Sequence, residues 1–171
     1  MLEMTSRSVP SVLIGLYRRA RPAIVGFSRP STQQGRTSMA LTLDEANRVL
    51  EATLAKAKQL NIKVSAAVVD AGGRLVAFQR MDNAIWASAY GSQGKAVASA
   101  AFGRTSGEMQ ARADQPTPRG INAASGGEMI MGQGAVPIIR NGVVEGACGV
   151  GGGTSQEDED CARAGVEALG R

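Results

Sequence analysis

The alternation of apolar and polar residues after residue 38 predicts a helix followed by a β-hairpin. Apolar side chains recur every three or four positions over 43–60, which is typical of an amphipathic helix. Thr42 and Glu45 have the spacing of a capping box at its start. Two apolar, β-branched runs follow at 64–70 and 74–80, and the Ala-Gly-Gly turn between them predicts a hairpin.

A second set of helices follows this hairpin. Residues 85–101 have helical spacing but consist largely of Ala, Ser and Gly, so we expect this helix to pack closely against a sheet or another subunit. Residues 106–113 are predicted to form a short helix. The stretch 114–127 contains Pro116, Pro118 and several glycines, which favours a loop.

A second hairpin closes the pattern. The apolar runs 135–140 and 143–150 flank Asn141-Gly142, the dipeptide that a two-residue type I′ turn requires. A glycine run then leads into an acidic first turn and a final helix that ends near residue 169. Because hairpins pair strands antiparallel, the order predicts an α+β domain with a single antiparallel sheet and helices packed on it.

Residues 1–38 differ in composition from the rest of the chain. Of the 19 basic and 15 acidic residues, six arginines and one glutamate lie in this leader, which leaves 13 and 14 for the remainder. We therefore predict a leader at 1–38 and one domain at 39–171. The leader has the Arg- and Ser-rich composition of an organelle transit peptide, and a disordered extension or a true start at Met39 explains it as well. The balanced charge of the domain gives no indication of nucleic-acid binding.

Composition excludes several classes of site. The chain has no histidine, which excludes Ser–His–Asp triads, histidine zinc sites and haem ligation by imidazole. Its two cysteines, Cys148 and Cys161, are too few for a four-thiolate metal site. They fit a reducing, cytoplasmic setting with buried thiols, and one disulfide between them is the alternative. With no histidine and only two cysteines, we predict no metal site. No apolar run approaches 18 residues, so we predict no membrane span.

Three short motifs have stronger structural than chemical interpretations. The glycine run 149–153 could hold an anion at a helix start, but it lacks the Walker lysine and precedes four acidic residues, which favours a tight turn. Ser92 and Lys95 match the S-x-x-K spacing of some acyl-transfer enzymes, but the companion motifs are absent. Asp70 ends a strand before Ala-Gly-Gly and is expected to accept hydrogen bonds from turn amides.

Charged and phenolic residues surround the small-residue helix. A functional interpretation is a cationic rim that binds carboxylates, and surface ion pairing is the alternative. Met81 and Tyr90 are the remaining side chains near this helix that could bind a metal, through a thioether and a phenolate, although core packing or surface exposure accounts for their presence equally well. The candidate ligand-binding residues are Arg80, Asp82, Tyr90, Lys95 and Arg104.

Several of these segments resemble the GlcG/HbpS-like family. The resemblance rests on Val68–Asp82 (VVDAGGRLVAFQRMD), on Lys95-Ala96 and on Ala100–Arg104 (AAFGR). It continues through the hairpin 136–150 and the Gly-Gly-Thr that follows, so it covers roughly residues 40–170 in order. Two departures are Asn83, where the family has glycine, and Gly-Arg-Thr-Ser at 103–106, where the family has a proline.

The resemblance implies a profilin-like α+β fold, a homo-oligomer and a haem-binding or haem-degrading role. Without histidine, an axial ligand of haem iron here would have to be Tyr, Met, Cys, a hydroxyl or water. We therefore predict an oligomeric protein that binds haem or a similar carboxylated small molecule, with Arg80, Lys95 and Arg104 pairing with carboxylates. One alternative is a small cofactor-independent enzyme or accessory subunit in catabolism of organic acids or aromatic compounds, with Lys95 or Asp82 as the acid–base residue. A further alternative is an assembly partner without a ligand.

Overall fold

A computed structural model describes residues 41–170, so the predicted leader at 1–38 lies outside the described residues and the boundary at residue 39 stays a prediction. None of the helices described is long and apolar enough to cross a membrane. The elements are α1 (Leu43–Gln59), β1 (Ser65–Asp70), β2 (Leu75–Arg80), α2 (Ala87–Phe102), α3 (Ser106–Gln110), α4 (Pro116–Ala124), β3 (Ala135–Arg140), β4 (Val143–Gly151) and α5 (Ser155–Glu167).

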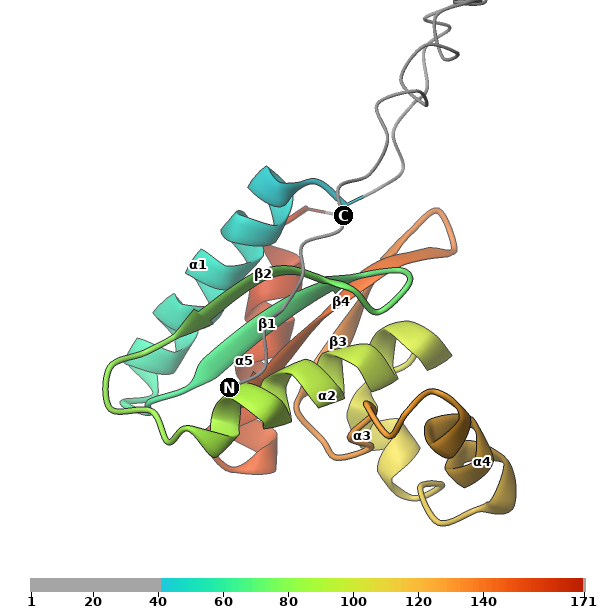
Figure 1. Cartoon of the computed structure of the whole chain (residues 1–171). Helices are drawn as coiled ribbons and strands as arrows, with labels where there is room; N and C mark the ends of the chain where they lie inside the picture. Colours follow the sequence, from blue (N-terminus) through green and yellow to red (C-terminus); the bar gives the residue numbers. More distant parts are fainter. Residues whose placement is uncertain (1–40, 171) are drawn as a thin grey trace, which may run out of the picture. The chain divides into compact units, whose positions relative to one another are not determined.

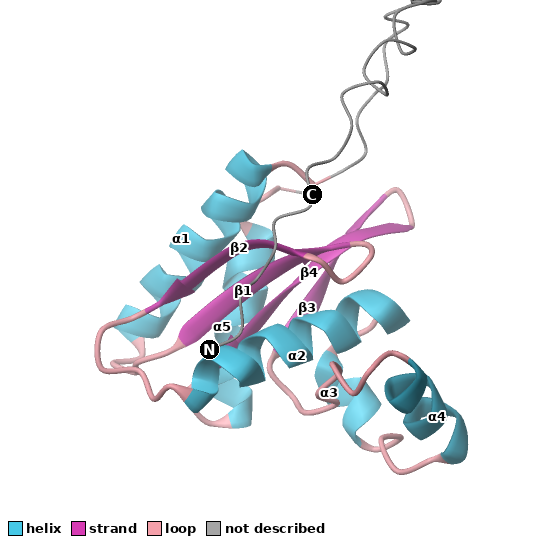
Figure 2. Ribbon diagram, in the orientation of Figure 1, coloured by secondary structure: helices cyan, strands magenta, loops and turns pink. Residues whose placement is uncertain are grey.

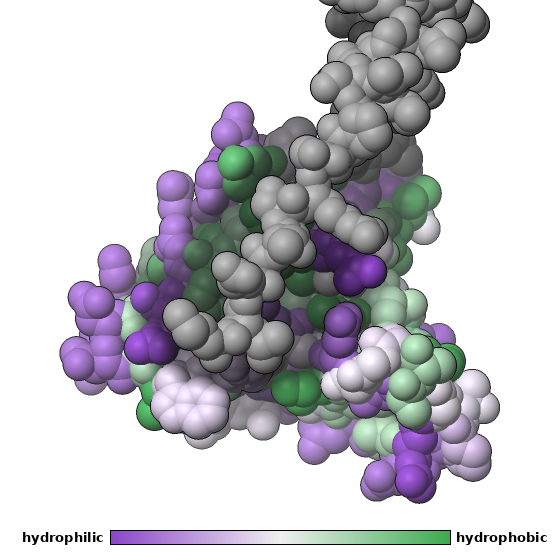
Figure 3. Space-filling model, in the orientation of Figure 1, coloured by the Kyte–Doolittle hydropathy of each residue, from purple (hydrophilic) through white to green (hydrophobic). Residues whose placement is uncertain are grey.

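The four strands form one antiparallel sheet in the order β2-β1-β4-β3 (Figure 2). α1 and α5 pack on one face of the sheet and α2 packs on the other (Figure 1). The main core lies under α1 and α5, where Val49 and Leu50 meet Val68 and Val150. The outer side of α1 carries hydrophilic residues, as its amphipathic pattern predicted (Figure 3). The α+β fold with a single antiparallel sheet is thus present.

The predicted local signals are confirmed at three turns and caps. Glu45 N–H donates to the Thr42 hydroxyl at 3.2 Å, and the Glu45 carboxylate accepts from the Thr42 amide at 2.9 Å. Asp70 Oδ1 accepts from the amides of Gly72 and Arg74 at 2.8 and 2.9 Å, so its turn role is confirmed. Asn141 and Gly142 have φ of 51° and 77°, as a type I′ turn needs.

The small residues of α2 allow a backbone-to-backbone approach to β4. A Cβ on Gly149 would overlap the carbonyl of Ser92 and lie 2.7 Å from the amide nitrogen of Ala96. On this face a compact alanine cluster, with Ala96 and Ala100 against Ala147, replaces bulky side chains. The expectation of a helix buried closely against a sheet is therefore confirmed.

One predicted element is wrong. The stretch 114–127 is not a continuous loop, because α4 occupies its middle. Pro116 stands at the first position of this helix, where its missing N–H leaves no hydrogen bond unmade and its fixed φ suits the helix. The prolines that indicated a loop instead mark a helix start.

Candidate functional site

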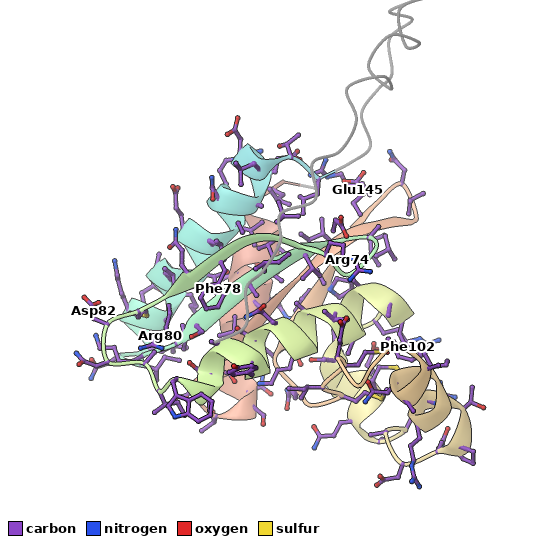
Figure 4. All side chains as sticks on the ribbon, viewed as in Figure 1. Arg74, Phe78, Arg80, Asp82, Phe102 and Glu145 are labelled. Carbon is purple, nitrogen blue, oxygen red and sulfur yellow. The ribbon has the colours of Figure 1, made fainter. Side chains whose placement is uncertain are left out.

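The five predicted ligand-binding residues lie in separate parts of the described domain. Arg80 and Asp82 lie together at the end of β2 (Figure 4) and line a hollow of about 500 Å³. Lys58, from the end of α1, and Lys63, from the loop before β1, line the same hollow, and neither was predicted. Within residues 41–170 no ion pair involves these three cations. The hollow therefore has a positive excess, since Asp82 is its one carboxylate.

Lys95 is held by other residues of the domain. Its ammonium nitrogen lies 2.8 Å from Asp158 Oδ2 and 3.1 Å from the Val150 carbonyl oxygen, and its side chain is only 14% exposed. Asp158 is 3% exposed, and its other oxygen accepts from the Gly153 amide at 2.9 Å. This ion pair joins α2 to β4 and to the first turn of α5. A ligand-binding or acid–base role for Lys95 stays a prediction, whereas its bond to Asp158 is a structural contact.

Arg104 lies at the opposite end of α2 from Arg80. Arg80 in β2 lies opposite Ser65 in the β1–β2 strand pair, and the Ser65 hydroxyl is 2.7 Å from that of Ser88 in the first turn of α2. Arg80 is therefore near the start of α2. Arg104 follows Gly103, which ends α2 in the left-handed conformation, and it is exposed. A helix of 16 residues spans about 24 Å. The structure therefore does not bring these two arginines to one ligand.

Tyr90 lines a second hollow, of about 360 Å³, between α2 and the β1–β2 turn. Val69, Leu75 and Val97 supply its apolar wall, and Arg74 supplies a cation. Its other polar side chains are Gln93 and Glu128. Arg74 was not predicted, although it directly follows the Asp-Ala-Gly-Gly turn and its amide donates to Asp70. The arrangement combines a phenol, a guanidinium and an apolar surface in one concavity.

An exposed aromatic pair continues this hollow along α2. Trp86 and Tyr90 are 70% and 69% exposed, and their rings meet edge to face at 5.8 Å between centroids. Two aliphatic side chains are exposed as well: Ile85, which precedes Trp86, and Leu75, which lines the hollow. α2 packs on β1, β4 and β3, so it leaves the edge strand β2 largely uncovered. Exposed apolar side chains of this size are typical of a surface that binds a ligand or another chain.

The remaining motifs have structural roles. Ser92 donates its hydroxyl to the Ala89 carbonyl at 3.1 Å, while Lys95 bonds to Asp158, so the S-x-x-K spacing does not form a catalytic pair. The glycine run leads into the Thr154 capping box of α5, which confirms a tight strand-to-helix turn.

Both cysteines are free and buried, as expected. Burial raises the pKa of Cys148 to about 12 and that of Cys161 to about 11. The thiolate form that would bind a metal is therefore strongly disfavoured in both. Among residues 41–170 no group of three His, Cys, Asp or Glu side chains is arranged to hold a metal ion.

Three comparisons place the domain among known proteins. It is 35% identical over 120 residues to a 15.0 kDa protein of the dhaT-dhaS intergenic region of Citrobacter freundii, covering 69% of this chain and 84% of that protein. A double mutant of HbpS from Streptomyces reticuli superimposes with a TM-score of 0.70 at 26% identity, covering 81% of this chain and 93% of that one. The structure of a PduOC:heme complex gives a TM-score of 0.69 at 26% identity, covering 77% and 96%.

These similarities confirm the resemblance to the GlcG/HbpS-like family and the predicted fold class. The model of one family, described as haem degrading protein HbpS-like, matches residues 41–167, which is nearly all of the described domain. The chain therefore belongs to the HbpS-like family.

Proposed function

We propose that this protein is an oligomeric small-ligand-binding protein whose ligand is haem or a similar carboxylated molecule, bound at the hollow of Tyr90 and Arg74. The observation that carries the proposal is the combination of an exposed phenol, a guanidinium and an apolar wall in one 360 Å³ concavity. The membership of the HbpS-like family and the fold shared with a PduOC:heme complex support this class of ligand.

We expect the residues of this hollow to contact one edge of a tetrapyrrole. Val69, Leu75 and Val97 would contact the apolar ring, and Arg74 would pair with a propionate. Tyr90 would supply an oxygen ligand for the haem iron, because tyrosine is an established haem ligand and the chain has no histidine. Bound haem would supply the iron chemistry. The predicted carboxylate partners Arg80 and Asp82 lie in the other hollow, and their contact with this ligand stays a prediction.

The oligomer is proposed from the same surface. A hollow of this volume is at the lower end for ligand sites. Its lining residue Leu75 is exposed, as are Trp86, whose ring contacts that of Tyr90, and the preceding Ile85. A second copy packed on these side chains would remove their apolar area from water and cover the open side of the ligand. We expect sedimentation to show a dimer or larger assembly, and Trp86→Glu to shift it toward the monomer. A wild-type monomer at micromolar concentration would contradict this part of the proposal.

Titration of the purified full chain with haemin tests the ligand. We expect a Soret shift that exceeds the shift given by serum albumin as a non-specific control. Tyr90→Phe should alter the spectrum and weaken binding at least tenfold, while Tyr17→Phe, the same change at the other tyrosine of the chain, should do neither. Arg74→Gln should weaken binding several-fold without moving the Soret band, and Arg112→Gln, at an exposed arginine outside this hollow, should not. A wild-type shift no larger than that of albumin would refute haem binding.

A second candidate function rests on the hollow of Arg80. Its three cations, Lys58, Lys63 and Arg80, outnumber its one carboxylate, Asp82, and this positive excess favours a small organic acid. This agrees with the alternative of an enzyme or accessory subunit in organic-acid catabolism, with Asp82 as the acid–base residue. A thermal-shift screen of mono- and dicarboxylates tests it: a stabilising acid should lose its effect in Arg80→Gln and keep it in Arg112→Gln. No stabilisation by any acid would contradict it.

A further inference from the structure

Glu145 is a buried carboxylate to which neither the fold nor the proposed function assigns a role. It lies in β4 at a β-bulge, because Ile138 pairs with Gly146 and Ile139 pairs with Val144, which leaves Glu145 without a partner in β3. Its side chain is only 2% exposed. A fully buried glutamate requires compensation by a cation or by hydrogen bonds, since burial removes its hydration.

That compensation is incomplete among the described residues. Arg140 contacts two carboxylates, with Nη2 at 2.8 Å from Glu45 Oε1 and Nη1 at 3.1 Å from Glu145 Oε2. The second contact lacks hydrogen-bond geometry, so the buried Oε2 atom has no hydrogen bond. One guanidinium therefore serves two carboxylates, which leaves one negative charge in excess at the buried end of the cluster.

Glu145 is also one of the residues that line a hollow of about 450 Å³. Glu145 lies at the end of the sheet near the β3–β4 turn (Figure 4), and Asp70 lines the hollow from the end of β1. Asp70 uses one oxygen, Oδ1, for both of its bonds to turn amides. The hollow has no cationic lining residue, and its walls are otherwise apolar or glycine: Leu41, Ala71, Gly72, Val76, Val143 and Val144.

We propose that this hollow binds the ammonium group of a small aliphatic amine, held between the carboxylates of Glu145 and Asp70. An ammonium supplies the missing positive charge, and its three N–H donors suit the carboxylates of two residues that line one cavity. The apolar walls would take the alkyl chain. A metal ion fits less well, because the residues described hold no cluster of three acidic or thiol ligands. This hollow shares no lining residue with that of Tyr90, so the inference does not depend on haem binding.

Amide-resolved NMR titration of the full-length protein with n-pentylammonium chloride tests the inference, with n-pentanol and sodium chloride at equal concentration as controls. We expect saturable shifts of the Glu145, Gly72 and Val144 amides with the amine, and not with the alcohol or the salt. Nα-acetyl-lysine amide forms a second arm of the test. If it gives the same shifts, the ligand class includes a lysine side chain, and if it gives none, the class is restricted to free amines. Both results support an ammonium site.

Three variants identify the carboxylates that act. Glu145→Gln keeps the side-chain volume and should weaken amine binding at least tenfold, and Asp70→Asn, which retains an oxygen for the turn amides, should weaken it several-fold. Glu51→Gln is the control, because Glu51 is an exposed carboxylate of α1 that neither pairs with Arg140 nor lines the hollow. It should change binding less than twofold. If Glu145→Gln does not fold, Asp70→Asn decides.

Two outcomes would overturn the inference. The first is the absence of saturable shifts at these amides for the wild-type protein. The second is equal weakening by Glu51→Gln and by the two hollow variants, which would indicate a general electrostatic effect instead of a site.

Discussion

Replacing Lys95 tests whether this predicted ligand-binding residue is a structural one. Lys95→Met keeps most of the aliphatic stem and removes the ammonium that Asp158 and the Val150 carbonyl accept from. Asp158 is then left 3% exposed with the Gly153 amide as its remaining donor. Breaking one partner of a buried ion pair costs about 3–5 kcal/mol. The loss is a large part of the stability of a small domain, which is about 5–15 kcal/mol.

The magnitude can be measured by thermal and urea unfolding followed by circular dichroism. For a domain of about 130 residues, each kcal/mol lowers Tm by about 3 °C, so Lys95→Met should lower it by about 10–15 °C. The control is Lys58→Met at an exposed lysine, which should change the unfolding free energy by less than about 0.5 kcal/mol. Adding Asp158→Asn to Lys95→Met should cost less than the sum of the two single changes, since the uncompensated carboxylate is gone.

A different result would refute the reasoning. If Lys95→Met leaves Tm unchanged and abolishes haemin or organic-acid binding, the ion pair contributes little to stability and Lys95 is a ligand-binding residue. If Tm falls as calculated and the refolded variant still binds ligand, the side chain is a structural element of the α2–α5 contact.

Three further changes probe other parts of the domain. Gly149→Ala should destabilise by about 1–3 kcal/mol in urea unfolding because its Cβ would overlap the backbone of α2, whereas Gly91→Ala, in open space on that helix, should stabilise by up to about 1 kcal/mol. The hydrogen bond from the N-cap amide of α1 lowers the pKa of Glu45 below its usual 4.5. The Glu45 carboxylate therefore stabilises the fold fully above pH 4.5, and this contribution is lost as pH falls through the lowered pKa. In Glu45→Gln the free energy of unfolding should depend less on pH in this range, and an unchanged pH dependence would contradict this. Cys148 and Cys161 should resist Ellman's reagent at pH 8 in the native protein and both react in guanidinium, and rapid native labelling would contradict their burial.

Local signals carried most of the fold prediction. Asn141-Gly142, Asp70 and the Thr42 capping box each act within four residues, so their geometry follows from sequence. α4 was missed because Pro116 is compatible with both a loop and the first turn of a helix, and the choice depends on packing.

The site was less predictable because its contacts are distant in sequence. Lys95 and Asp158 are 63 positions apart, and no spacing rule connects them. A cation-rich composition around α2 indicated carboxylate binding, but it did not reveal that Lys95 already had a partner. Arg80 and Asp82 were adjacent in sequence and remained together, whereas Lys58 and Lys63 reach the same hollow only through the turn after α1.

The alanine and glycine contact between α2 and β4 has a thermodynamic consequence. Side chains of this size remove little hydrocarbon area from water when they pack, and the heat capacity of unfolding grows with the hydrocarbon area that becomes hydrated. The face of the sheet that α2 covers therefore contributes little to the heat capacity of unfolding. The free energy of unfolding should in consequence vary slowly with temperature, so that the domain tolerates cooling and moderate warming with little change in its folded fraction.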